Sequence, residues 1–213
     1  MAARTLLFDL DGTLSDNFAG IAASICHALE RLDVAAPDAA VLRSCVGPPL
    51  RESFAQLLAT NDHALIERAI ALYRERFSAS GWRENVVYDG IDDALRALSA
   101  TGARMFICTA KPEAFARRIA EHFGFDAWIE RVYGADFAGH YDDKARLMAH
   151  LLATERVDPA QAAMIGDRGK DIRAARANGV RAIGVLWGYG SREELADADA
   201  WVATTREMTA AAA

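Results

Sequence analysis

The feature of this sequence that most restricts its fold is a series of short apolar runs, separated by helical patterns and each followed by polar or turn residues. Runs of this length with such boundaries predict buried β-strands. Strands that alternate with helices indicate a parallel sheet with helices on both of its faces. The sequence therefore predicts an α/β fold, with strands at residues 5–11, 104–108, 128–133, 162–165 and 182–186.

Residues 16–85 interrupt this alternation, because only helical periodicity is visible among them. We predict a small all-α cap domain at 16–85, inserted after the first strand, and an α/β core domain made of residues 1–15 and 86–213. The alternative is that these helices simply continue a single core. Two apolar stripes at helical spacing carry the prediction: Ile21, Ile25, Leu29 and Leu32, and Leu65, Ala69, Leu72 and Tyr73.

In the rest of the chain, single residues mark where helices and strands are expected to begin and end. Pro112 and Gly124 have the positions expected at the start and just past the end of a helix that carries Phe115, Ile119 and Phe123 on one face. The run at 182–186 is expected to be the last strand, with residues 187–191 as a loop beyond it. Ser191 and Glu194 have the spacing of a helix capping box, which gives this serine a structural role. The alanines at 210–213 are expected to fray.

The composition excludes several classes of protein. With 213 residues, of which 52% are hydrophobic and 25% charged, the chain has the make-up of an ordinary globular protein. The net charge is −6 and no basic stripe is visible, so a long nucleic acid is not an expected partner. Any phosphate that this protein binds should therefore belong to a small molecule.

The sequence predicts neither a signal peptide nor a membrane span. No apolar stretch has the length of a membrane span, and the N-terminal run is too short for a signal peptide, so no membrane partner is expected. Cys26, Cys45 and Cys108 are far apart and form no CxxC pair, which predicts free thiols and no zinc site. We expect a cytoplasmic protein; the sequence leaves open whether it is a monomer or a dimer.

Polar residues that follow the apolar runs are the candidates for chemistry. Parallel sheets bind ligands at the carboxyl ends of their strands, so these residues are expected to converge at one edge. They are Asp9 and Asp11 after the first run, Thr109 and Lys111 after the second, Lys144 after the third and Asp167 after the fourth.

Asp9 and Asp11 are two residues apart on an extended chain and therefore point to the same side. Two carboxylates this close repel each other unless a cation lies between them. A site with a few carboxylate oxygens suits Mg²⁺. A calcium-binding EF-hand loop is excluded, because Leu14 and Gly20 stand where that loop needs glycine and glutamate. A surface Asp-Gly turn remains the alternative.

The segment Asp9-Leu-Asp11-Gly12-Thr13-Leu14 resembles the first motif of the haloacid dehalogenase (HAD) superfamily. The later motifs of that family follow in the same order, and the resemblance covers nearly the whole chain. The helical insert is similar to the cap of the subfamily that contains phosphoglycolate phosphatases. The resemblance implies a three-layered Rossmann-like core. The matching positions are Thr109, Lys144, Gly166-Asp167 and Asp171.

The resemblance also implies a role for each matching residue. Asp9 would be the nucleophile and form an aspartyl-phosphate, while Asp11 would be the general acid and base. Lys144 would neutralise charge and steady Asp9. Mg²⁺ would be held by Asp9, Asp167 and the backbone carbonyl of Asp11. Phosphoryl oxygens would be bound by Thr109 and the amide of Ala110. Asp171 would contact a metal-bound water or Lys144.

Two residue patterns separate branches of the superfamily. Dehalogenases lack an acid two residues after the nucleophile, so Asp11 favours phosphoryl transfer. Residues 16–85 contain no lysine, which excludes the branch that cleaves phosphonates through a Schiff base. The resulting prediction is a Mg²⁺-dependent phosphatase for a small phosphorylated metabolite, with phosphoglycolate as the first choice. A 5′-nucleotidase or sugar-phosphate phosphatase is the alternative, and a non-catalytic phospholigand-binding protein is a more remote one.

For three basic residues the sequence is compatible with two different roles. Arg51 either pairs with an anionic leaving group such as a carboxylate or is a solvated residue at a helix start. Arg168 either serves the site or forms an ion pair with Asp171 or a neighbour. Lys111 is either part of the site or an exposed residue at a helix start.

Overall fold

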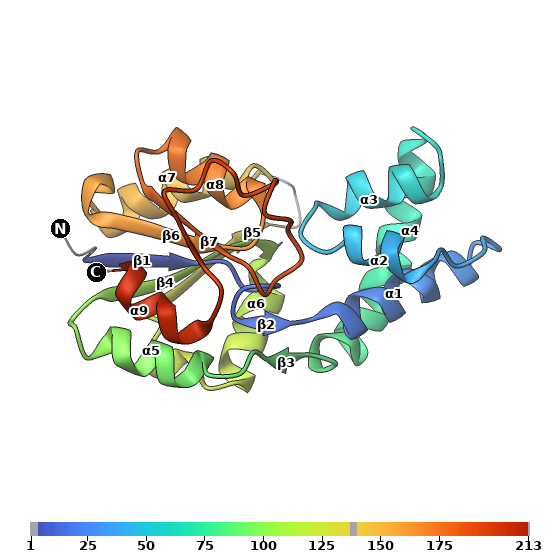
Figure 1. Cartoon of the computed structure of the whole chain (residues 1–213). Helices are drawn as coiled ribbons and strands as arrows, with labels where there is room; N and C mark the ends of the chain where they lie inside the picture. The colour runs from blue at the N-terminus through green and yellow to red at the C-terminus, as the bar shows by residue number, and fades with distance from the viewer. Residues whose placement is uncertain (1–3, 137–139, 213) are drawn as a thin grey trace. The chain divides into compact units, whose positions relative to one another are not determined.

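The structure is a computed structural model, and it describes residues 4–136 and 140–212. The chain divides into two compact units, shown in Figure 1. We call Met1–Ser15 with Val87–Ala213 the core unit, and Asp16–Val86 the helical unit. The chain passes between the units in a short two-stranded sheet made of β2 (Ser15–Asp16) and β3 (Val86–Val87).

The core unit is built on a six-stranded sheet with the strand order β5-β4-β1-β6-β7-β8, in which all strand pairs are parallel. Its strands are β1 (Thr5–Phe8), β4 (Arg104–Pro112), β5 (Arg131–Ala135), β6 (Ala162–Gly166), β7 (Arg181–Val185) and β8 (Ala200–Val202). The chain builds the sheet outward from β1 on one side and then on the other, so the order reverses beside β1. The predicted α/β class with a parallel sheet is confirmed.

Each predicted strand is present, with shifted boundaries. β1 ends at Phe8, earlier than predicted, although the amide of Asp9 still donates to the carbonyl of Ile165 (2.9 Å). The prediction that residues 182–186 form the last strand is wrong, because β8 pairs with β7 at the edge of the sheet. β8 has only three residues and lies in a stretch without a continuous apolar run, so apolar patterning does not predict it.

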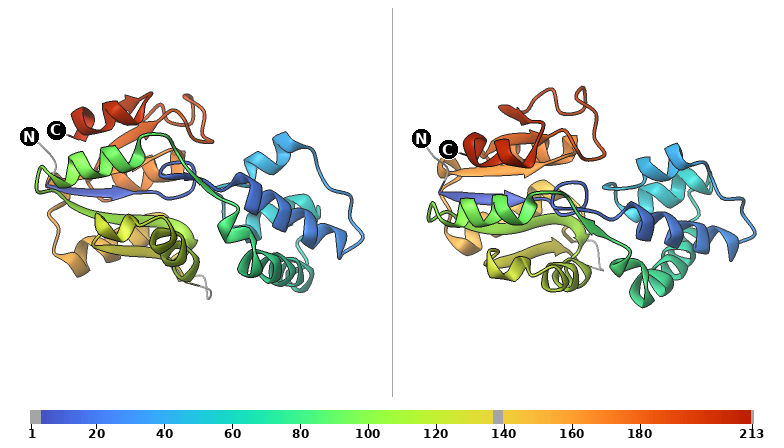
Figure 2. Two further views of the ribbon diagram at one scale, coloured as in Figure 1. Left: turned by 90° about the horizontal axis from the view of Figure 1, so that it is seen from below. Right: turned by 60° about the horizontal axis from the view of Figure 1, so that its bottom comes forward.

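Helices cover both faces of this sheet. Figure 1 shows α7 (Lys144–Glu155) and α8 (Gly169–Ala177) on one face, with α5 (Ile91–Ser99) and α9 (Thr205–Ala212) on the other. The view from below in Figure 2 brings the face with α5 and α9 to the front. The predicted α6 (Glu113–His122) follows Pro112 and ends before Gly124, whose positive φ of 70° glycine tolerates best. Short 3₁₀ turns at Phe125–Ala127 and Pro159–Gln161 lead into β5 and β6.

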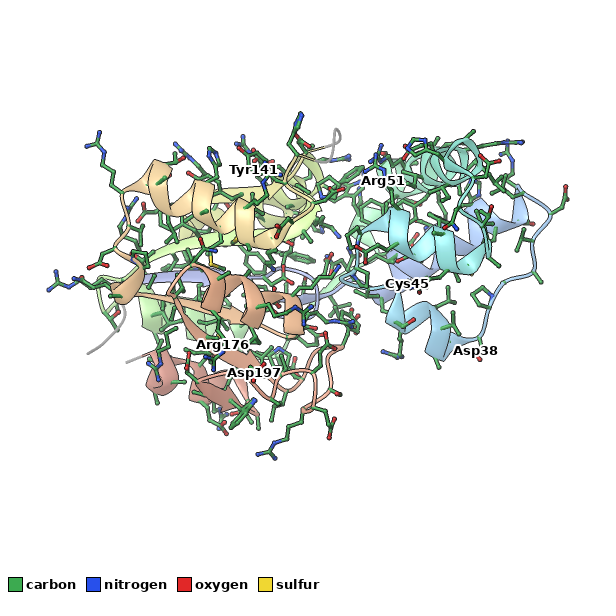
Figure 3. All side chains as sticks on the ribbon, turned by 90° about the horizontal axis from the view of Figure 1, so that it is seen from above. Asp38, Cys45, Arg51, Tyr141, Arg176 and Asp197 are labelled. Atoms are coloured by element: carbon green, nitrogen blue, oxygen red, sulfur yellow. The ribbon has the colours of Figure 1, made fainter. Side chains whose placement is uncertain are left out.

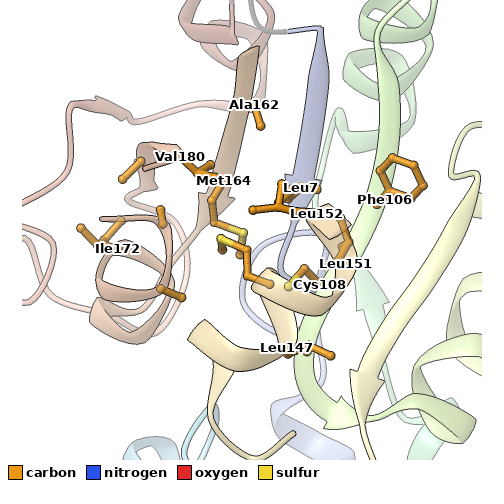
Figure 4. Close-up of a cluster of buried hydrophobic side chains, with 14 of the residues drawn as sticks. Leu7, Phe106, Cys108, Leu147, Leu151, Leu152, Ala162, Met164, Ile172 and Val180 are labelled. Atoms are coloured by element: carbon orange, nitrogen blue, oxygen red, sulfur yellow. The ribbon is translucent and has the colours of Figure 1, made fainter. Parts of the chain in front are cut away.

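The face of the sheet under α7 and α8 carries a large apolar cluster (Figure 4). Side chains at every second strand position reach it, as Phe106 and Cys108 of β4 illustrate. Leu147 and Leu151, four residues apart on α7, pack on this layer. Each such buried side chain contributes about 1.5–3 kcal/mol through removal of apolar surface from water.

The predicted fraying of the terminal alanines is wrong for the described residues. α9 continues through Ala212, and both Met208 and Ala212 are buried. Alanine has the highest intrinsic helix propensity, and burial of one helix face adds tertiary stabilisation. None of the helices in residues 4–136 and 140–212 is long and apolar enough to cross a membrane.

The helical unit contains α1 (Phe18–Glu30), α2 (Ala39–Ser44), α3 (Leu50–Leu57), α4 (His63–Ala79) and the 3₁₀ turn η1 (Gly81–Arg83). Asp62 caps α4 by accepting from the amides of Ala64 and Leu65. The buried face of α4 is rotated from the predicted stripe, since Leu65 and Leu72 are half-buried. Its fully buried residues are Ile66, Ala69, Ile70, Tyr73 and Phe77.

A polar network joins the amino ends of β4 and β5 to the end of α7. The carboxylate of Glu155 accepts from the Tyr133 hydroxyl (2.6 Å), from Arg104 (2.8 Å) and from Arg131 (3.1 Å). The hydrogen bond from Tyr133, with help from both guanidinium groups, lowers the pKa of Glu155 despite the opposing effect of burial. The folded state therefore favours the charged form of this residue.

We expect Glu155→Gln to lower the free energy of unfolding at neutral pH by about 1–3 kcal/mol, because hydrogen bonds to a charged group are lost. Since the pKa of Glu155 is lowered by folding, its contribution is complete above the pKa of an unfolded glutamate, about 4.3, and fades as the pH falls further. Urea unfolding of both proteins at pH 7 and in the acid range measures this difference.

Glu130→Gln is the matched control, because Glu130 pairs with the same Arg104 but is 43% exposed. Exposed ion pairs contribute roughly 0–1 kcal/mol. Equal losses for Glu130→Gln and Glu155→Gln, or a Glu155→Gln loss that stays constant into the acid range, would contradict this account.

Candidate functional site

The polar residues singled out in the sequence lie in the core unit around the carboxyl ends of β1, β4 and β6. Asp9 follows β1 directly, and Asp167 follows β6 in the same way. This is the point where the strand order reverses, which is where open parallel sheets bind ligands. The charged or hydroxyl side chains concerned are all 9% exposed or less: Asp9, Asp11, Thr109, Lys111, Lys144, Asp167 and Asp171.

A tight turn after β1 sets the first two carboxylates. The carbonyl of Leu10 accepts from the amides of Thr13, Leu14 and Ser15. Gly12 has φ +86°, and a β-carbon there would lie 2.2 Å from Oδ2 of Asp167. Glycine is therefore required both by the backbone and by the close approach of Asp167. The surface-turn alternative is wrong, because Asp9 is 5% exposed.

Three carboxylates and one ammonium form a buried cluster. One oxygen each of Asp9, Asp167 and Asp171 lies within 4.8 Å of the others. The Nζ of Lys144 is 3.0 Å from Oδ1 of Asp9 and also pairs with Asp171. Lys144 is the first residue of α7, and Asp143 caps this helix by accepting from the amide of Ala145. One ammonium against three carboxylates leaves two negative charges without a counter-charge in this cluster.

The pKa values in the cluster follow from burial and from neighbouring charges. Burial, with the charges of Asp171 and Asp9, raises the pKa of Asp167 well above its ordinary value. Burial also raises the pKa of Asp171, although Lys144 opposes this effect. For Lys144, burial lowers the pKa, but Asp171 and Asp9 outweigh it and raise the pKa overall. A cation among these oxygens would relieve the repulsion.

The donor set of this cluster fits a divalent cation. All three acidic residues offer oxygen, which hard cations prefer over softer metals. A thiol contribution is not expected, because burial raises the pKa of the nearby Cys108 to about 12 and keeps it protonated. With all three carboxylates ionised, Asp9, Asp167, Asp171 and Lys144 together carry a formal charge of −2, which a divalent ion would neutralise.

Asp167 is held in place by the loop after β7. The amide of Tyr189 donates to Oδ2 of Asp167 (2.8 Å), and the Thr13 hydroxyl lies 3.3 Å from Oδ1. The indole of Trp187 in turn donates to the carbonyl of Thr13 (3.1 Å). A β-carbon at Gly188 would lie 2.4 Å from the β-carbon of Asp167. From the sequence this stretch is predicted only as a loop. Its two glycines, Gly188 and Gly190, were the sequence signal for a backbone that approaches another segment closely.

Lys111 is one of the three basic residues whose roles the sequence leaves open. β4 continues through Pro112, so Lys111 is on a strand, and it forms an ion pair with Oδ2 of Asp11. The side chains of Lys111 and Asp11 are 5% and 10% exposed. The interpretation of Lys111 as an exposed residue at a helix start is wrong. Its position two residues after Thr109 on an extended chain was the available signal.

The contacts of Asp171 and Arg168 show which of their predicted positions and pairings the structure contains. Asp171 is 1% exposed and accepts from the amide of Arg168 (3.0 Å) through Oδ2, so it is not a surface residue of α8. The Nε of Arg168 lies 3.2 Å from Oε1 of Glu194, which also accepts from the amide of Gly169 (2.9 Å). Arg168 therefore forms an ion pair with a neighbour, which was one of its two predicted roles.

The predicted capping box at Ser191 is only partly present. The Ser191 hydroxyl accepts from the amide of Glu194 (3.2 Å), as such a box requires. The following residues form turns and no helix, however, and the Glu194 carboxylate bonds to Gly169 and Arg168. The Glu194 carboxylate thus contacts the start of α8 and not the backbone of Ser191.

Arg51 lies in the helical unit, at the first turn of α3 (labelled in Figure 3). Its Nε is 2.7 Å from Oε1 of Glu67 on α4, and its side chain is 37% exposed. Part of its charge is therefore compensated within the helical unit. Its role toward a substrate stays a prediction, as do those of Thr109 and Ala110.

Comparison with known proteins identifies one family model and relatives that are named for different activities. The family model described as haloacid dehalogenase-like hydrolase matches residues 6–185. A 5′-nucleotidase of Pseudomonas aeruginosa is 44% identical over 89% of this chain and 86% of its own length. The tyrosine-protein kinase PtkA of Mycobacterium tuberculosis is 37% identical over 97% of this chain and 69% of its length.

A phosphoglycolate phosphatase of Pseudomonas putida is more distant, at 30% identity over 87% of this chain and 70% of its own length. Among solved structures, a predicted phosphatase from Clostridium acetobutylicum superposes with a TM-score of 0.94 at 34% identity. That match covers 99% of this chain and 98% of the other.

Proposed function

Because the chain belongs to the haloacid dehalogenase-like hydrolases and is a phosphatase of that family, we propose that it is a Mg²⁺-dependent phosphomonoesterase with Asp9 as nucleophile. The observation that carries this proposal is the buried cluster in which Lys144 contacts Asp9 and Asp171 beside Asp167. Burial of such a cluster is costly, and groups with strongly shifted pKa values are concentrated at functional sites.

The proposed reaction has two steps. In the first, a carboxylate oxygen of Asp9 bonds to phosphorus while the ester oxygen leaves and takes a proton from Asp11. In the second, Asp11 accepts a proton from a water whose oxygen bonds to phosphorus. The bond from phosphorus to Asp9 then breaks, which releases inorganic phosphate and restores both aspartates.

The other residues of the site support these steps. Mg²⁺, when bound by the carboxylates of Asp9 and Asp167 and the backbone carbonyl of Asp11, would stabilise charge on the phosphoryl group. Lys144 neutralises Asp9 and orients it, and Asp171 holds Lys144 in place. The hydroxyl of Thr109 and the amide of Ala110 would bind phosphoryl oxygens.

For the substrate, the comparisons favour a nucleoside 5′-monophosphate. The 5′-nucleotidase relative is 44% identical and the phosphoglycolate phosphatase relative 30%, which reverses the order that the sequence patterns suggested. Phosphoglycolate remains the second candidate. Arg51 of the helical unit is our candidate for recognising a negatively charged leaving group.

Replacement of Asp9 by asparagine tests the nucleophile. We expect Asp9→Asn to lower phosphate release from p-nitrophenyl phosphate by on the order of 10³-fold or more, since the amide cannot form the covalent intermediate. Removal of Mg²⁺ with a chelator should have a comparable effect. Inorganic phosphate is measured directly, with Mg²⁺ added or withheld.

Asp92→Asn is the matched control, because it makes the same chemical change at a residue of α5 that is 61% exposed. It should leave the rate unchanged. Equal rates for wild type and Asp9→Asn would refute the proposed nucleophile. Because one relative is a tyrosine kinase, the wild type should also be incubated with ATP; transfer of phosphate to protein tyrosine without its release as inorganic phosphate would contradict the phosphatase assignment.

The preferred substrate is tested by comparing kcat/KM. We expect nucleoside 5′-monophosphates to exceed phosphoglycolate by about tenfold or more, which corresponds to about 1.4 kcal/mol of transition-state binding. The reverse order would assign the enzyme to phosphoglycolate and contradict the nucleotide proposal. Sugar phosphates belong in the same comparison.

A further inference from the structure

The ion pair between Lys111 and Asp11 has no part in the mechanism given above. It joins residues that are 100 positions apart, and both side chains are at least nine-tenths buried. Lys111 lies two residues after Thr109 on β4, and Asp11 two residues after Asp9 on the turn that follows β1. The pair therefore connects the proposed general acid to the strand end that carries the proposed phosphoryl-binding residue.

From this geometry we infer that Lys111 is a positioning residue that holds the Asp11 carboxylate in its reactive orientation, an inference that rests on the proposed phosphatase function. The ammonium of Lys111 contacts Oδ2 of Asp11. A carboxylate held through one oxygen presents its other oxygen in a fixed direction. That oxygen, Oδ1, is the one that exchanges protons with the leaving group and later with water.

The backbone of Lys111 supports the same assembly. Its amide donates to the Thr109 hydroxyl oxygen (3.3 Å). Because the hydroxyl oxygen is used as an acceptor there, its own hydrogen is directed elsewhere and can be donated to a phosphoryl oxygen. Lys111 thus fixes Asp11 with its side chain and Thr109 with its backbone.

Lys111 contributes at a definite stage of each step. When the Asp11 proton moves to the leaving oxygen as the bond from that oxygen to phosphorus breaks, a negative charge forms on Asp11 next to the ammonium. When Asp11 then takes a proton from the attacking water, the ammonium has kept the carboxylate aimed at that water. Lys111 itself neither gains nor loses a proton.

Two other roles make different predictions. A lysine that bound the phosphoryl group directly would affect esters with good and poor leaving groups alike. A lysine that only stabilised the fold would change the amount of folded protein but not the selectivity among esters. An effect through Asp11 instead appears mainly where the leaving group needs a proton, and it disappears when Asp11 is already lost.

The experiment compares phenyl phosphate with p-nitrophenyl phosphate in wild type, Lys111→Met, Lys111→Arg, Asp11→Asn and the double variant Lys111→Met/Asp11→Asn. The two esters are similar in shape, but nitrophenolate leaves without protonation and phenolate does so much less readily. The quantity measured is kcat/KM, which reports the steps up to the formation of the aspartyl-phosphate. Thermal unfolding shows the folded fraction of each protein.

We expect Lys111→Met to lower kcat/KM for phenyl phosphate by about tenfold more than for p-nitrophenyl phosphate. Lys111→Arg, which keeps the charge, should retain most of the wild-type ratio between the two esters. In the Asp11→Asn background, Lys111→Met should change either rate by less than about threefold, because its effect acts through Asp11. The double variant removes both buried charges and therefore leaves neither one unpaired. If Lys111→Met alone is unfolded, the double variant can still be compared with Asp11→Asn.

Equal losses on both esters in Lys111→Met would overturn the inference, and so would a full further loss in the Asp11→Asn background. Asp9→Asn, measured beside these variants, reports the proposed function separately. If Asp9→Asn is as active as wild type, the proposed function fails and the inference falls with it. If Asp9→Asn is inactive and the Lys111 variants show no selectivity, only the inference is overturned.

Discussion

The structure depends on a set of like charges held together inside the core unit. Asp9 follows β1, whereas Asp167 and Asp171 lie four residues apart between β6 and the first turn of α8. The ammonium of Lys144, at the start of α7, contacts Asp9 and Asp171. Burial of carboxylates is unfavourable unless each has a counter-charge or hydrogen-bond donors. The raised pKa values of Asp167 and Asp171 express this cost. A divalent cation bound among these oxygens would supply the positive charge that one lysine cannot.

The sheet topology explains why these residues meet. β1 lies between β4 and β6, so residues after these three strands share one edge of the sheet. The turn at Gly12 brings Asp9 and Asp11 to that edge, and the loop at 187–190 packs against Asp167 from the side of β7. Apolar packing beneath α7 and α8 fixes the helices that deliver Lys144 and Asp171. The packing of the core unit therefore positions the charges.

Much of this could be predicted from the sequence because the signals are local. Apolar runs predict strands, and the residues that follow them converge whenever the strands are parallel. The contacts that could not be predicted connect distant segments: Lys111 with Asp11, Tyr189 with Asp167, and Glu194 with Arg168 and Gly169. Periodicity carries no information on such pairs. β8 and the helical C-terminus were missed for a related reason, since their stability comes from packing on the rest of the core unit.

We propose that the buried carboxylates form a binding site for one divalent cation. Isothermal titration of Mg²⁺ into wild type, Asp167→Asn and the exposed control Asp92→Asn tests it without any substrate. The account predicts saturable binding of a single ion to wild type and Asp92→Asn, with an affinity about tenfold or more weaker in Asp167→Asn. Unchanged affinity in Asp167→Asn, or no saturable binding by wild type, would contradict it.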